Sequence, residues 1–169
     1  TKCARKKQPS SNHDSACSRL ISLYGDYSDI HYAIHRTEIY RDVLRNSYIK
    51  DNNFFHIMTT ANTFILGKVK ELDTLHVIRH IQSPYGRRVF NKNHPESSNT
   101  YWWITGNEWS NNLELLQKSI VNNLIKIDNI SSEEAQKAYE LSFFMYFSMY
   151  LSHKTDGAEE LEGLYKKNY

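Results

Sequence analysis

Apolar side chains recur every three or four residues along most of this chain, the spacing that places them on one face of an α-helix. The first run predicts a helix over about residues 28–49, and the next run predicts a second helix over about 54–81. The polar stretch 50–53 between them is short, so we expect an antiparallel helical hairpin over 28–81. Gly67 is the weak point of the second helix, where we expect any bend.

Two further helices are predicted by the residues that would start them. The stretches 105–108 and 131–134 both place a serine or threonine three residues before a glutamate, which is the capping box that opens many helices. They predict helices over about 106–128 and 132–153, followed by a short C-terminal helix. The helix over 132–153 is apolar nearly all round in its second half, so we expect it at the centre of a bundle.

These patterns together predict an all-α fold, a bundle of four main helices that forms a single domain over residues 20–169. The N-terminal segment 1–19 is polar and basic, and is expected to lie outside this domain. Residues 82–100 contain turn-forming residues and little periodicity, and they predict a long loop between the second and third helices. A loop of that length in a compact domain is usually functional or mobile.

Composition limits the function mainly by exclusion. The chain has 169 residues, enough for one domain with a buried core. No stretch reaches the ~20 apolar residues that cross a bilayer. The net charge is only +2, which argues against nucleic acid as a partner. Glycine-rich phosphate loops, serine-hydrolase motifs and cysteine-nucleophile signatures do not occur, so the sequence favours a non-enzymatic protein without a cofactor.

Both cysteines, Cys3 and Cys17, lie in the N-terminal segment. The chain begins with Thr1 instead of methionine, which is consistent with removal of a leader, and paired cysteines suit the oxidising compartments that exported proteins reach. We therefore expect a Cys3–Cys17 disulfide in a secreted or periplasmic protein. A cytoplasmic protein with two free thiols is the alternative.

Two histidine pairs have the four-residue spacing of helical metal sites. One pair is His31 and His35, with Glu38 three residues further on, and the other is His76 and His80. At ~1.5 Å per residue the two pairs would lie roughly 13 Å out of level on the predicted hairpin, too far to share a zinc ion. A metal-binding bundle that uses one pair is an alternative function. The simpler interpretation is that these residues belong to the helix surface or core.

The stretch from Arg88 to His94 has the spacing R-x5-H. This spacing resembles the motif of helical HEPN-type ribonucleases, in which the arginine and histidine sit on a helix and serve RNA cleavage. The resemblance implies a ribonuclease-like toxin that uses Arg88 and His94. Pro95 departs from the pattern, because a proline disfavours helical backbone at the residue before it.

Aromatic and basic residues gather in and beside the predicted long loop. Tryptophan, tyrosine and arginine are enriched at protein-binding hot spots. The sequence therefore favours a small protein-binding module, such as an inhibitor or immunity-type protein that neutralises or docks onto another protein. The predicted contact residues are Tyr85, Arg87, Arg88, Phe90, Lys92, His94, Trp102 and Trp103. In the alternative interpretation, the two tryptophans and Phe90 fold inward and attach the loop to the bundle.

Overall fold

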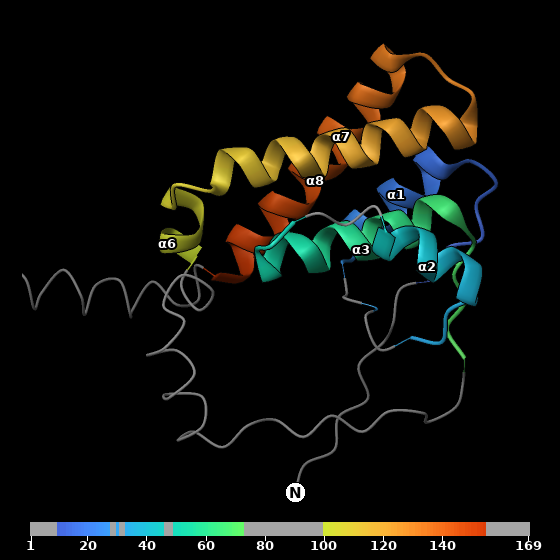
Figure 1. Cartoon of the computed structure of the whole chain (residues 1–169), viewed down its shortest axis with the longest axis horizontal. Helices are drawn as coiled ribbons and strands as arrows, with labels where there is room; N and C mark the ends of the chain where they lie inside the picture. Colours follow the sequence, from blue (N-terminus) through green and yellow to red (C-terminus); the bar gives the residue numbers. More distant parts are fainter. Residues whose placement is uncertain (1–9, 28–29, 31–32, 46–48, 73–99, 155–169) are drawn as a thin grey trace, which may run out of the picture.

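The computed structural model of this chain describes residues 10–27, 30, 33–45, 49–72 and 100–154. Within these ranges the regular structure consists of six helices and no β-strand (Figure 1). The helices are α1 (Ala16–Gly25), α2 (Thr37–Arg45), α3 (Asn52–Leu66), α6 (Thr100–Thr105), α7 (Trp109–Asp128) and α8 (Ser132–Lys154). The predicted all-α fold class is confirmed.

Four of these helices share one hydrophobic core. α1 packs against α3, α7 and α8, while α3 packs along α7 and α7 packs along α8. Figure 1 shows α7 lying across the molecule above α3, with the short α6 at its N-terminal end. The smaller α2 packs on α3. All four main helices contribute buried side chains to this core, among them Leu20, Tyr24, Phe64, Leu116 and Tyr146.

The prediction of a hairpin over 28–81 is wrong at its first helix. α1 begins at Ala16, within the segment that we assigned to the polar N-terminus, and α2 covers only residues 37–45. Ser15 opens α1 because its hydroxyl accepts a hydrogen bond from the Ser18 amide at 3.1 Å. The buried face of α1 also has the helical spacing of apolar residues, but the run is short and follows a strongly polar stretch.

The second predicted helix, over 54–81, ends early. α3 ends at Leu66, where the Gly67 amide donates back into the last turn at 3.2 Å and the chain then becomes extended. Val69 and Ser11 follow with an antiparallel pair of hydrogen bonds of 2.8 and 3.0 Å. Gly67 therefore marks the end of the helix instead of a bend within it. Most of the remaining predicted helix lies outside the described residues.

One of the two predicted capping boxes is confirmed. The Ser131 amide donates to the Glu134 carboxylate at 2.9 Å, and the Glu134 amide donates to the Ser131 hydroxyl at 3.2 Å. α8 starts directly after Ser131, as predicted. The other box is wrong, because Thr105 ends α6 and α7 begins only at Trp109, without a side-chain cap. α7 therefore starts at Trp109, an aromatic residue that packs against the core, and no side-chain hydroxyl caps it.

A buried arginine joins α1 to the end of α3. The Arg19 side chain is only 4% exposed. Its Nε donates to the Phe64 carbonyl at 2.7 Å, and its Nη2 donates to the Ile65 carbonyl at 2.6 Å. Nη1 donates to the carbonyls of Asp14 and His13, at 2.6 and 3.0 Å. Arg19 thus satisfies carbonyl groups that a helix leaves open in its last turn, and its positive charge lies at the favourable end of the α3 dipole.

The last residue of α7 binds the N-terminal end of α1. The Asp128 carboxylate accepts hydrogen bonds from the amides of Ala16 and Cys17 at 2.7 and 2.8 Å. Burial raises the pKa of this carboxyl, but the two amides, the Cys17 thiol and the Arg19 charge together hold the pKa below its ordinary value of 3.8. Asp128 is therefore charged at neutral pH and caps the N-terminus of α1.

A buried amide fixes how α3 lies along α7. The Asn62 side chain is fully buried. Its amide nitrogen donates to the Ser119 hydroxyl at 2.9 Å, and its carbonyl oxygen accepts from the Asn123 amide group at 2.9 Å. Sliding one helix along the other would leave these buried polar groups without partners, so the network favours one register.

We expect Arg19→Leu to lower the free energy of unfolding by about 2–5 kcal/mol, because the buried Phe64 and Ile65 carbonyls lose their donors. Urea unfolding followed by circular dichroism measures this change. Lys68→Ala is the matched control: it removes an exposed cation that pairs with Asp14 at 2.7 Å, and should change stability little. Equal losses in both variants would contradict the role given to Arg19.

Asp128→Ala should cost about 1 kcal/mol of stability at pH 7, because α1 loses its N-terminal acceptor. Since the folded pKa of Asp128 is below 3.8, its contribution is present above pH 3.8 and is lost as the pH falls through the folded pKa. The stability difference between wild type and variant should therefore shrink in urea titrations carried from pH 7 down to about pH 2. Glu114→Ala, an exposed carboxylate on the same helix, should show no such change.

Candidate functional site

Most of the residues that the sequence singled out lie outside the described part of the chain. These are Cys3, His31, His76, His80, Tyr85, Arg87, Arg88, Phe90, Lys92 and His94. Trp102 belongs to α6, but its side chain is likewise not among those described. The predicted contact loop and the pair of residues in the ribonuclease-like motif therefore stay predictions. His35, Glu38, Cys17 and Trp103 can be placed.

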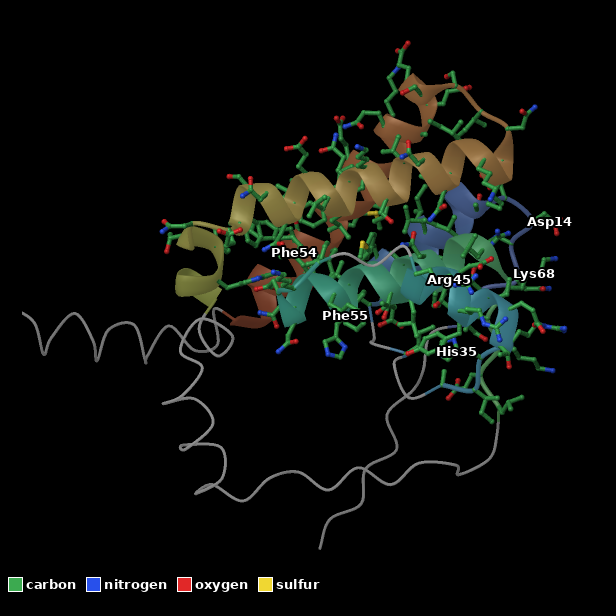
Figure 2. The ribbon with its side chains drawn as sticks, viewed as in Figure 1. Asp14, His35, Arg45, Phe54, Phe55 and Lys68 are labelled. Atoms are coloured by element: carbon green, nitrogen blue, oxygen red, sulfur yellow. The ribbon has the colours of Figure 1, made fainter. Side chains whose placement is uncertain are left out.

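Trp103 lies in the core. Its side chain is 5% exposed, and its ring centroid lies 5.1 Å from that of Phe54 and 4.7 Å from that of Trp109. Its indole Nε1 donates to the Asp51 carboxylate at 3.3 Å. Figure 2 shows Phe54 between the ribbons of α3 and α7. The buried position of Trp103 agrees with the alternative in which the tryptophans and Phe90 fold inward, but the loop that they would attach lies outside the described residues.

The described histidine of the first pair makes local contacts. The His35 ring stacks on Tyr40 with centroids 4.4 Å apart, and its Nε2 lies 3.3 Å from the Ile30 carbonyl oxygen. Glu38 is exposed at the start of α2. No three histidine, cysteine, aspartate or glutamate side chains among the described residues are grouped so that they could hold a metal ion.

Cys17 carries a free thiol in this structure, while Cys3, the other cysteine of the expected disulfide, lies outside the described residues. The Cys17 amide is held by Asp128 at 2.8 Å, in the first turn of α1. Burial, followed by its hydrogen bond to Asp128 and the nearby negative charge, raises the pKa of the thiol from an ordinary 9.0 to about 11. At neutral pH this thiol is protonated, which is the opposite of what a catalytic nucleophile needs.

The described surface has an apolar groove between α7 and α8. The groove is open to solvent and has a volume of about 270 Å³. Its aromatic floor consists of Tyr139, Phe143 and Phe147, with Leu113 and Phe144 beside it. Its polar wall consists of Gln117, Gln136 and Glu140. Phe144 is 70% exposed, which is unusual for so large an apolar side chain. The neighbouring Leu141 is 52% exposed and extends the apolar surface along α8.

α8 is therefore not the central helix that its composition predicted. α1 and α7 cover one side of it, and the residues that face away from both remain at the surface. The apolar run could have indicated this groove, but a buried helix and a helix with an exposed apolar stripe have the same composition. Only the position of the neighbouring helices distinguishes them.

The floor of the groove is held by stacked rings. Tyr139 stacks on Phe143 with centroids 5.7 Å apart, and Phe143 stacks on Phe147 at 6.0 Å. Phe147 then meets Trp109 of α7 at 6.1 Å, and Trp109 contacts the core. Side chains packed in this way have few alternative rotamers, so the groove is largely formed before any ligand arrives.

The polar wall carries one negative charge that no cation in the described surroundings neutralises. Gln117 donates to Gln136 at 3.0 Å, and Gln136 donates to the Glu140 carboxylate at 2.7 Å. The nearest lysine along the helix, Lys137, is paired with Glu133 at 2.7 Å. The wall therefore offers amide groups and a carboxylate next to the aromatic floor.

Comparison with known proteins gives no match for this chain: no protein family, no curated protein and no solved structure matches it. No helix among the described residues has both the length and the apolar character needed to cross a bilayer.

Because burial and Asp128 keep the Cys17 thiol protonated, we expect it to react slowly. In a Cys3→Ser variant at pH 8, modification by DTNB (a thiol-specific disulfide reagent) should be about 100-fold slower than that of an unperturbed thiol. Asp128→Ala in the same background should speed the reaction, because it removes the hydrogen bond and the negative charge. A rate equal to that of free glutathione would contradict the environment described for Cys17.

Proposed function

We propose that this chain is a small non-enzymatic helical module that binds another protein through the groove between α7 and α8. The observation that carries this proposal is Phe144, a large apolar side chain that is 70% exposed beside a preformed aromatic floor. Apolar surface of this kind costs free energy in water, and burying it against a partner recovers that free energy. Aromatic side chains are also the type most enriched at the centre of protein interfaces.

The chemistry of the groove favours one kind of partner segment. An amphipathic helix could place apolar side chains against Phe143, Phe144 and Phe147, as helices do in other hydrophobic grooves. Glu140 lies on the polar wall, and its charge is not balanced by Lys137, which pairs with Glu133. A lysine or arginine beside the apolar side chains of the partner would complement this carboxylate. An inhibitor or immunity-type protein needs only such a contact surface to neutralise its target.

A photo-crosslinking residue at position 144, introduced in cells, tests the proposed surface. We expect a crosslink to a partner segment that is apolar and flanked by lysine or arginine, and none from the same residue at position 122, which is exposed on α7 away from the groove. With the purified partner, Phe144→Ser should weaken binding by about 10–100-fold. Its melting temperature should stay near that of the wild type, because the side chain is largely exposed.

Two results would contradict the proposal. Equal crosslinking from positions 144 and 122 would mean that the groove has no special role. Crosslinks only between copies of this chain, with a doubled mass in solution that Phe144→Ser abolishes, would assign the groove to self-association. Glu140→Gln is the matched test of charge: it should weaken binding to the basic segment less than Phe144→Ser does, and the weakening should disappear at high salt.

A further inference from the structure

A second concave surface, separate from the groove, lies beside α2. This hollow is shallow and open to solvent, and its volume of about 520 Å³ falls within the roughly 300–1,000 Å³ of small-molecule sites. Thr37, Tyr40, Arg41, Leu44 and Arg45 line it from one face of α2, since they follow the helical spacing i, i+3, i+4, i+7 and i+8. Ala33 and His35, in the segment before α2, complete the lining, and Figure 2 shows His35 beside α2.

Two arginines on this face have no partner within the described part of the chain. Arg41 and Arg45 are exposed, and neither guanidinium forms a hydrogen bond or an ion pair there. They are four residues apart on one helix, so their Cβ atoms lie about 6 Å apart. Two like charges at this spacing repel one another unless an anion lies between them. A doubly charged head group could accept hydrogen bonds from both guanidinium forks.

The rest of the lining is suited to a flat or apolar body. The rings of His35 and Tyr40 stack at 4.4 Å with only 23° between their planes, and so form a continuous wall. Leu44 adds an exposed aliphatic side chain to the lining. Thr37 adds a hydroxyl that can donate or accept a hydrogen bond. An inorganic ion would leave this wall without contacts, and an uncharged ring would leave both guanidiniums without counter-charge.

We propose that the hollow beside α2 binds a small organic phosphate monoester. The phosphoryl group would lie between Arg41 and Arg45, and its planar or apolar body would lie against Tyr40, His35 and Leu44. This proposal does not depend on the protein-binding groove, because the two sites share no residue. Either one can be wrong without affecting the other.

Isothermal titration calorimetry with three probes tests the recognised chemistry. Adenosine monophosphate carries both the head group and a planar body, adenosine lacks the phosphate, and inorganic phosphate lacks the body. At low ionic strength, adenosine monophosphate should bind at least about tenfold more tightly than either of the others. Added salt should weaken it, because the guanidiniums are exposed.

Variants of the three arginines in this segment provide the matched comparison. Arg41→Gln with Arg45→Gln should weaken adenosine monophosphate binding by about 100-fold, roughly tenfold for each lost guanidinium. Arg36→Gln removes an equal exposed charge just before α2 that does not line the hollow, and should change binding less than about twofold. Circular dichroism should show the same helix content in all variants. Phe144→Ser should bind the nucleotide as the wild type does.

Three results would overturn the proposal. Adenosine that binds as well as its monophosphate would mean that the guanidiniums do not recognise the head group. An equal loss from Arg36→Gln would indicate general attraction to surface charge. No binding of adenosine monophosphate at millimolar concentration would show that the hollow is not a phosphate site.

Replacement of Arg41 and Arg45 by lysine, which keeps the charge but not the planar fork, should weaken binding by about tenfold.

Discussion

The buried guanidinium of Arg19 is the contact on which the arrangement of this protein depends. A charged side chain that is nearly removed from water must find partners for its donors, and Arg19 finds four backbone carbonyls from two separate segments. Two of those carbonyls belong to the last turn of α3 and would otherwise be buried without a donor. The same side chain therefore ends α3 and holds α1 against it.

The N-terminal end of α1, where Arg19 also lies, is held by a second and equally specific contact. Asp128 closes the N-terminus of α1 from the last residue of α7. α1 thus has a positive side chain bound to the end of one neighbour and a negative side chain from another bound to its own start. The apolar core between these helices supplies most of the favourable free energy, while Arg19, Asp128 and the buried Asn62 network decide which of many apolar contacts is formed.

The same arrangement accounts for the two proposed binding surfaces. Because α1 and α7 cover only part of α8, the aromatic side chains on its remaining face lie at the surface, supported from below by Trp109 and the core. α2 packs on α3, while Arg41 and Arg45 of α2 are exposed to solvent. One surface is aromatic with a single carboxylate and the other is cationic, so the two are suited to ligands of opposite charge.

The sequence by itself determined that the chain is helical, and it placed the helix over 132–153 to within a residue. Apolar spacing and the Ser131–Glu134 capping box are local properties, and they act in the same way in any fold. The sequence also indicated that the regions of α3 and α7 are helical, although it did not indicate where α3 ends.

Tertiary structure alone decided which face of α8 is exposed, and it added long-range partners to the local signals at the start of α1 and the end of α3. The carboxylate that caps α1 together with Ser15 lies 112 residues away from Ala16 in the sequence, and the Arg19 donor at the end of α3 lies 45 residues before Phe64. Phe144 and Phe143 are the same residue type in adjacent positions, but only Phe143 packs against the core. A local pattern cannot distinguish such neighbours, because burial depends on which helix happens to lie on that side.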